Sequence, residues 1–255
     1  MEALDLAILA AAAFATSILS AVVGMAGGIT LLAVMLLFLE PLAAIPLHGV
    51  IQLVSNSSRT AIQRRHVDLH ILLRYSALLV PMGWLGLHLA NALPAAAMRV
   101  MIGVFVLIAT WFPGWLLLGT HPEETNPGRR FLILGGVVGV LNMTIGATGP
   151  LIAPFFLNLG LDRRALVGTK AACQTLGHVA KLAVFGLAGF AFLQFAGPLA
   201  LLVTAGACVV AGTWIGSQIL ERVSERFFRR LYMGVLSVIA LRLLAGEVFA
   251  LHLSP

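Results

Sequence analysis

Two groups of polar side chains are spaced for one face of a helix and stand inside apolar stretches of the sequence. Their members are His48, Gln52, Asn56 and Arg59 in the first group, and Lys170, Gln174, His178 and Lys181 in the second. Within each group the intervals are four, four and three residues, which places every member on one side of an α-helix. All eight side chains can donate hydrogen bonds or carry positive charge, and none is a carboxylate. This chemistry suits a site for an oxyanion, whose oxygens accept hydrogen bonds and whose charge is offset by cations.

The two groups belong to an internal repeat. A shift of 122 positions, without a gap, superimposes Gly24 on Gly146, Gly27 on Gly149, Glu40 on Asp162, Gln52 on Gln174, and Arg59 on Lys181. Two matched polar helices, here predicted at Leu42–Ser58 and Ala165–Ala188, are typical of the two halves of a membrane transporter. Gln52 and Gln174 lie about ten residues into these segments, so we expect both amides near mid-membrane, where polar groups usually face a transport pathway.

The composition indicates a membrane protein with many spans. Of the 255 residues, 60% are hydrophobic and only 10% are charged, whereas soluble domains carry about 25% charged residues. The mean hydropathy is +1.01. We predict an all-α polytopic membrane protein with about ten transmembrane or re-entrant segments, since a span needs about 20 apolar residues. The net charge of +6 does not indicate nucleic-acid binding, because the basic residues lie in short loops between segments.

Loop charges predict that the two halves face opposite sides of the membrane. The loop at Arg59–Arg74 holds four arginines and should be cytoplasmic, whereas Lys181 is the one basic residue of its equivalent, Lys181–Ala196. The other equivalent loops show the same opposite bias, which indicates two inverted five-segment repeats with both termini outside the cytoplasm. The predicted organisation is a first transmembrane repeat at residues 1–118, a cytoplasmic linker at 119–130 and a second transmembrane repeat at 131–255.

Each half also contains an apolar segment that is interrupted by helix breakers, at Gly24–Gly28 and at Asn142–Pro150. Unpaired backbone at membrane depth is tolerated only where it is buried in protein or lines a cavity. We therefore interpret both interruptions as broken helices or re-entrant hairpins at a binding site. Glycine-mediated packing between helices is the alternative. Helix N-termini that follow Gly28 and Pro150 would direct their positive dipole ends toward an anion.

The predicted substrate-binding residues come from both polar helices and both interruptions. They are Gln52, Gln174, Lys170, His48, Asn56, His178, Asn142, Thr148, Gly27 and Gly149, with Arg59 and Lys181 as gate or secondary anion contacts. Alternatives stay open: Lys170 could extend to the membrane interface, His178 could be a packed histidine, and the two gate residues could only fix the topology. No catalytic residue, metal ligand or cofactor is predicted, because the sequence has neither an HExxH metal motif nor a GxSxG nucleophile motif.

Several glycine motifs resemble those of a known family. They are Ser20–Gly28, Gly135–Gly139, Gly146–Pro150 followed by Pro154, Gly83–Gly86 and Gly212–Gly216. Over about Ala12–Leu244, the chain resembles the TauE/SafE sulfite exporter family. This resemblance implies a multi-pass protein of the bacterial inner membrane that exports sulfite or a small organosulfonate such as sulfoacetate.

We therefore predict an anion exporter that works by alternating access around a site in the middle of the membrane. Its partners would be a small anionic substrate and the lipid bilayer, not nucleic acid, and the sequence leaves the oligomeric state open. Export from a cell that is negative inside gains about 2.3 kcal/mol per charge for each 100 mV. The alternatives are a carrier for another small anion such as a carboxylate, and a non-transporting membrane assembly factor. The sequence also leaves open whether His48, His178 or Lys170 relays protons.

Overall fold

The computed structural model describes residues 7, 10–18, 26–117, 126–156, 159–191, 198–219 and 225–253. Every regular element in these ranges is helical, so the prediction of an all-α protein is confirmed. After a helix at residues 10–18 come α2 (Ala26–Met35), α3 (Pro41–Ile62), α4 (Leu69–Ser76), α5 (Leu79–Ala92), α6 (Ala95–Trp111), α7 (Pro127–Thr144), α8 (Gly149–Ile152), α9 (Arg163–Leu187), α10 (Pro198–Ile219) and α11 (Glu225–Leu253). The 3-10 helices are η1 (Arg64–His66), η2 (Pro113–Leu117) and η3 (Ala153–Phe156).

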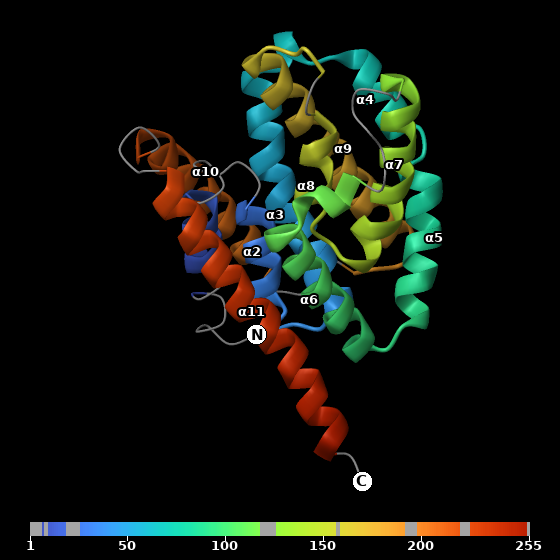
Figure 1. Ribbon diagram of the computed structural model, residues 1–255, viewed down its shortest axis with the longest axis vertical. Helices are drawn as coiled ribbons and strands as arrows, with labels where there is room; N and C mark the ends of the chain where they lie inside the picture. The colour runs from blue at the N-terminus through green and yellow to red at the C-terminus, as the bar shows by residue number, and fades with distance from the viewer. Residues whose placement is uncertain are drawn as a thin grey trace.

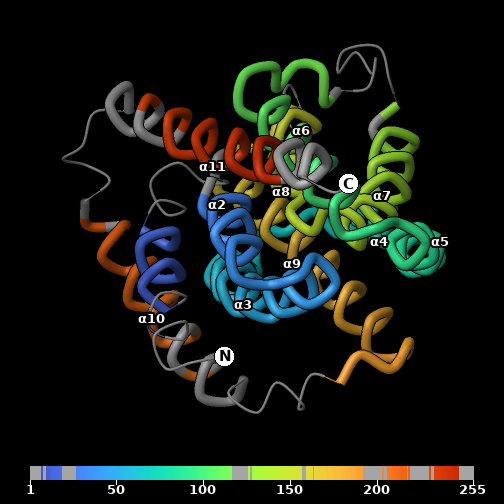
Figure 2. Tube along the Cα trace, turned by 90° about the horizontal axis from the view of Figure 1, so that it is seen from below, coloured from blue at the N-terminus to red at the C-terminus, as the bar shows by residue number. Residues whose placement is uncertain are grey.

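The two helices that carry the polar groups, α3 and α9, pack along each other in the middle of the bundle (Figure 1). Figure 2 shows α10 on one side of this pair and α5 with α7 on the other. Side chains join the pair directly, because Thr60 Oγ1 lies 3.1 Å from Thr175 Oγ1. Thr169 Oγ1 also accepts the N–H of Asp68 at 2.9 Å, which ties α9 to the start of α4. The packing brings the polar faces of both halves to one interface.

The equivalent starts of α3 and α9 are stabilised differently. The Asp162 carboxylate accepts the N–H of Ala165 at 2.8 Å, and this hydrogen bond holds the pKa of Asp162 below its usual value. At the other start, Pro41 occupies the first position of α3, and the Glu40 side chain makes no capping hydrogen bond. Glu40 instead forms a salt bridge with Arg99 at 2.7 Å.

Close approaches at glycine fix the outer helices. A Cβ atom added to Gly86 on α5 would lie 2.5 Å from the carbonyl oxygen of Val140 on α7. On the other side of the bundle, a Cβ at Gly212 on α10 would lie 2.5 Å from the carbonyl oxygen of Phe14 in the helix at residues 10–18. Neither approach leaves space for a side chain at the glycine. A third pair, α6 and α11, packs across the front of the bundle (Figure 1).

The interruption predicted at Asn142–Pro150 is present. α7 ends inside it, Gly146 adopts a φ of +85°, and α8 then begins. This left-handed backbone favours glycine, which has no Cβ to clash with its own carbonyl groups. Of the interruption at Gly24–Gly28, only the end lies within the described residues, where α2 begins. Residues 119–125 of the predicted linker also lie outside the described residues, and α7 starts within the remainder of that linker.

The outer surface of the bundle is rich in exposed apolar side chains. Large examples on four helices are Leu73, Trp111, Val203, Trp214 and Val238. Within the described residues, the stretch Leu69–Ala92, formed by α4 and α5, is long and apolar enough to cross a membrane, and shorter apolar helices occupy α6 and parts of α10 and α11. An exposed apolar surface of this kind fits contact with lipid better than contact with water.

Candidate substrate-binding site

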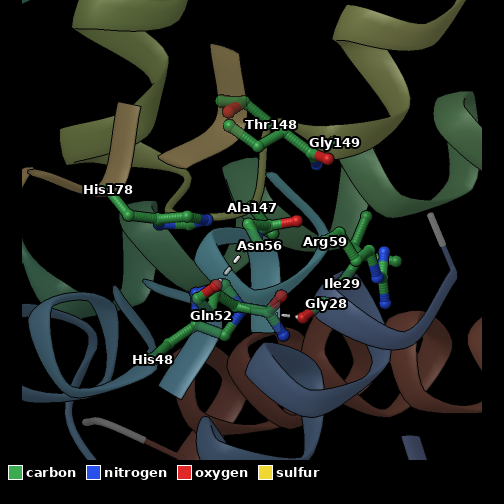
Figure 3. Close-up of a pocket in the computed structure, with 11 residues that line it drawn as sticks. Gly28, Ile29, His48, Gln52, Asn56, Arg59, Ala147, Thr148, Gly149 and His178 are labelled. Atoms are coloured by element: carbon green, nitrogen blue, oxygen red, sulfur yellow. Dashed lines mark hydrogen bonds between the residues drawn. The ribbon is translucent and has the colours of Figure 1, made fainter. Parts of the chain in front are cut away.

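A pocket lies where α2, α3, α9 and the turn before α8 meet (Figure 3). Its lining residues are Gly28, Ile29, His48, Gln52, Asn56, Arg59, Ala147, Thr148, Gly149, Gln174 and His178. The free space among them is about 330 Å³, including the open mouth. None of these described lining residues is acidic, and Arg59 is the one permanently charged side chain among them. The pocket therefore presents hydrogen-bond donors and positive charge.

One wall of the pocket is α3 packed against the first turn of α2. His48 Nε2 lies 2.8 Å from the carbonyl oxygen of Gly28. Gln52 is one turn further along α3, and its amide carbon would be 3.3 Å from a Cβ at Gly28. Because glycine has no Cβ, the Gln52 amide packs directly on the α2 backbone, as Figure 3 shows. The first N–H groups of a helix lack partners within it, so this wall places an amide beside backbone donors.

Asn56 and Arg59 continue the same face of α3. The buried Asn56 amide donates from Nδ2 to the backbone carbonyl oxygen of Gln52 at 3.0 Å. The half-buried Arg59 guanidinium donates to Ser55 Oγ at 3.4 Å. Both hydrogen bonds run along α3 and bring no negative charge to the pocket. A cation at this position lowers the electrostatic cost of placing an anion here.

The opposite wall is α9, which contributes Gln174 and His178. The His178 ring packs edge-on against the His48 ring, with 5.9 Å between centroids and 73° between planes. Nδ1 of each histidine is buried and has no hydrogen-bond partner among the described residues. Gln174 is the residue that the 122-residue shift superimposes on Gln52, so the two amides predicted to be equivalent line one space.

The turn between α7 and α8 completes the pocket and is held by Lys181. Lys181 Nζ donates to the carbonyl oxygen of Gly146 at 2.6 Å, and the side chain is 0% exposed. Its stem passes Gly49 of α3, where a Cβ would lie 2.9 Å from Lys181 Cδ. Lys181 thus fixes the turn that presents Thr148 and Gly149, and does not itself line the pocket.

The structure places most of the predicted site residues in the lining of the pocket. Those in the lining are Gln52, Gln174, His48, Asn56, His178, Thr148, Gly149 and Arg59, and those outside it are Lys170, Asn142, Gly27 and Lys181. Lys170 is half-buried one turn before the α9 amide. Asn142 donates from Nδ2 to the carbonyl oxygen of Gly177 at 2.7 Å, and Gly27 adjoins the lining residue Gly28. In this conformation these four residues stand behind the lining, from where the two lysines can act on a bound anion only through their charge.

Three lining residues, Gly28, Ile29 and Ala147, were not among the predicted site residues. Two of them lie within the interruptions, directly beside the predicted Gly27 and Thr148, so the interruptions carried the signal for them. Ile29 is an apolar residue in an apolar stretch, so the sequence gives no sign that it lines a binding site. Its place follows only from where α2 begins.

A family profile matches nearly the whole chain. It is the one described as Sulfite exporter TauE/SafE, and it covers residues 9–243, which include every lining residue of the pocket. No curated protein and no solved structure matches the chain. The sequence profile and the helical architecture thus agree on a membrane transport protein.

Proposed function

The chain belongs to the TauE/SafE sulfite exporter family of membrane transport proteins, and on this premise we propose that it exports a small sulfur-containing anion. The substrate would be sulfite or an organosulfonate such as sulfoacetate, carried out of the cell across the bacterial inner membrane. Both chain termini would then lie outside the cytoplasm. The binding site would be the pocket between α3 and α9.

The charge of the pocket is the observation that carries this proposal. The described lining holds Arg59, three amide side chains and two histidines, and none of it is acidic. A buried anion needs donors or cations around it, whereas hard cations are bound by carboxylate and carbonyl oxygens. The amide groups of Gln52 and Gln174 and the hydroxyl of Thr148 can each donate to an oxyanion. This lining supports an anion and disfavours a metal cation.

The two equivalent amides support a site shared between two halves of the protein. Gln52 and Gln174 reach one pocket from α3 and α9, although 122 positions separate them. The lateral contacts are also reciprocal: α5 rests on α7 of the other half, and α10 rests on the helix at residues 10–18. These exchanges support two inverted five-segment repeats, at residues 1–118 and 131–255, around a pseudo-two-fold axis.

Transport would follow alternating access. The pocket lies at the contact between the halves, and interrupted segments of both halves border it, at α2 and at the turn before α8. Rocking of one half against the other would move these segments past α3 and α9 and open the pocket to the opposite side. The membrane potential favours export of each negative charge by about 2.3 kcal/mol per 100 mV.

Anion efflux from proteoliposomes tests the proposed function. We expect vesicles with the protein to release sulfite and sulfoacetate faster than protein-free vesicles. The double variant Gln52→Ala/Gln174→Ala should abolish this flux, because both amide donors are lost. Gln63→Ala is the matched control, since Gln63 follows α3 outside the pocket. A Cβ added at Gly168 would lie 2.9 Å from Gln63 Cβ and 3.1 Å from its carbonyl oxygen, and alanine keeps both atoms.

A thermal-shift series with sulfite, sulfonates, sulfate and carboxylates identifies the preferred anion, because a ligand of the folded protein raises its melting temperature. A carrier for another anion, such as a carboxylate, should show its largest shift and its flux with that anion. A non-transporting assembly factor should release none of them. Equal flux in the wild type and the double variant would remove this pocket from the proposal.

A further inference from the structure

The two pocket histidines form a pair that anion binding by the amides does not explain. His48 on α3 and His178 on α9 are 1% and 7% exposed, and their rings are in edge contact. They are not equivalent in the repeat, since His48 corresponds to Lys170 and His178 to Asn56. The pair is therefore created by the packing of α3 on α9, at the contact between the two halves.

The hydrogen bond of His48 determines where a further proton can bind. A carbonyl oxygen only accepts, so the contact of 2.8 Å with Gly28 requires that Nε2 carries the hydrogen. In the neutral ring, Nδ1 then holds a lone pair. Nδ1 of His48 and Nδ1 of His178 are both buried without a partner among the described residues. Buried polar atoms are nearly always paired, so a water molecule or a ligand is expected at these two positions, and the lone pair on His48 Nδ1 can take up a proton.

The charged groups around the pair are basic. Lys181 and Lys170 lie on α9, and Arg59 lies on α3. The other elements packed against α3 or α9 also hold mainly basic groups. They are His70, Arg74 and the buried Tyr75 on α4, the exposed His88 on α5, Arg99 on α6, Arg129 and Arg130 on α7, and Arg64, Arg65 and His66 in η1. The described residues of α2, α8 and α10 include no acidic or basic side chain. The nearby carboxylates Glu40, Asp68 and Asp162 stand at the starts of α3, α4 and α9, and none of them lines the pocket. A proton added to the pair thus finds no carboxylate among the described lining residues, and the bound anion is the counter-charge that the pocket can offer.

We propose that the His48–His178 pair binds one proton together with the transported anion, so that export is coupled to proton movement. This inference rests on the proposed function and adds a coupling ion to it. The proton passes from water in the open pocket to Nδ1 of a neutral ring, and no other bond changes. Linkage makes the effect reciprocal: the bound anion strengthens proton binding, and the proton strengthens anion binding. One fewer negative charge then crosses the membrane with each anion.

Substrate accumulation in proteoliposomes at clamped zero voltage tests the coupling. Sulfoacetate is the probe, because its acid groups stay ionised near neutral pH and any pH response must then come from the protein. With the wild type, the steady-state ratio of sulfoacetate across the membrane should change about tenfold for each unit of pH difference, in the direction of proton flow. An uncoupled carrier leaves the two concentrations equal.

Two variants and one control locate the proton site. His178→Gln and His48→Gln remove the titratable rings, and glutamine at position 48 keeps an N–H donor for Gly28. Because both rings line the pocket, downhill flux of sulfoacetate is expected to fall in both variants, and its pH-driven accumulation should be lost. His88→Gln, at an exposed position on α5, should accumulate sulfoacetate like the wild type. If the wild type carries sulfite but not sulfoacetate, sulfite serves as the probe. Sulfite itself binds a proton near neutral pH, and this contribution is the same for the wild type and the variants. The difference between their pH-driven accumulation ratios therefore reports the proton bound by the protein.

The possible outcomes separate this inference from the proposed function. A wild type that carries the anion without pH-driven accumulation overturns the coupling and leaves the exporter standing. Accumulation that persists in both histidine variants places the proton elsewhere and also overturns the inference. If a variant carries no anion, the shift in its melting temperature that the probe causes is measured at two pH values. A shift that depends on pH as in the wild type contradicts the inference. A shift that no longer depends on pH supports it. Absence of flux for every anion contradicts the proposed function instead.

Discussion

The two stretches that the 122-residue shift superimposes hold their interrupted segments through corresponding helices, α3 and α9, but with different residues. In the first half, α3 reaches the start of α2 through His48, which bonds the carbonyl oxygen of Gly28. In the second half, α9 reaches the turn before α8 through Lys181, which bonds the carbonyl oxygen of Gly146. His48 and Lys181 are not equivalent, because they come from opposite ends of the polar group. Within the described residues, the backbone of each interruption thus accepts a side-chain hydrogen bond from α3 or α9, but from a different turn of the helix.

The residues that correspond to His48 and Lys181 have the opposite relation to the pocket. Arg59 corresponds to Lys181 and lines the pocket, whereas Lys170 corresponds to His48 and does not. A cation that is structural in one half therefore lies at the pocket in the other. As a result, α3 contributes four lining side chains and α9 contributes two. The 122-residue shift thus matches the positions of hydrogen-bond donors on α3 and α9. The packing around each position determines whether the donor lines the pocket or bonds the backbone of an interruption.

Removal of the Lys181 contact should have the largest effect. Lys181→Met keeps most of the side-chain volume and leaves the Gly146 carbonyl without its donor. A buried carbonyl left without its donor costs about 1–3 kcal/mol, so thermal unfolding should occur at a clearly lower temperature. Anion efflux should also fall, because the turn that presents Thr148 loosens. Lys170→Met is the matched control and should keep the wild-type melting temperature. Equal melting temperatures for the two variants would show that Lys181 does not hold the turn.

Removal of the equivalent cation in the first half should act on binding instead. Arg59→Gln should weaken anion binding about tenfold, as loss of one charged contact of about 1.4 kcal/mol does, with little change in melting temperature. Titration of the thermal shift with sulfite measures this affinity. Arg64→Gln, at an exposed position in η1, is the control and should bind like the wild type. If Arg59→Gln also binds sulfite like the wild type, Arg59 does not contribute to anion binding and does not differ from Lys181 in this respect.

The fold class and the polar helices could be predicted because they depend on local sequence. α3 and α9 begin within two residues of the predicted segments at Leu42–Ser58 and Ala165–Ala188. The intervals of four and three residues then determined which side chains share a face. The glycine-containing interruption before Pro150 was also visible, because glycine and proline act on the backbone of their own segment.

The roles of individual cations could not be predicted, because they depend on which neighbour each one meets. Lys181 is buried because Gly49 of α3 leaves space for its stem, and the sequence does not show that these residues meet. Asn142 was predicted in the site because it starts the interruption. However, α7 continues past it, and its amide meets Gly177 of α9 rather than the pocket. Helical spacing gives the face of a residue, whereas packing between helices gives its partner.

The smallest expected effect is a difference in melting temperature between variants at the starts of α3 and α9. Asp162→Ala removes the carboxylate that accepts the N–H of Ala165, so α9 loses its cap. Glu40→Ala removes no cap and only an exposed salt bridge to Arg99, and such pairs contribute little to stability. We therefore expect a lower melting temperature for Asp162→Ala than for Glu40→Ala. Equal melting temperatures would mean that the two starts are equivalent after all.

Acid should separate the same two variants again. The pKa of Asp162 is lower in the folded protein than in the unfolded chain, mainly because its carboxylate accepts the Ala165 N–H. Its stabilisation is therefore present above the unfolded pKa and is lost as the pH falls through the folded pKa. Over that acid range, the melting temperature should fall less steeply for Asp162→Ala than for the wild type, whereas Glu40→Ala should follow the wild type. A parallel decline in all three proteins would mean that the cap adds nothing to the acid sensitivity of α9.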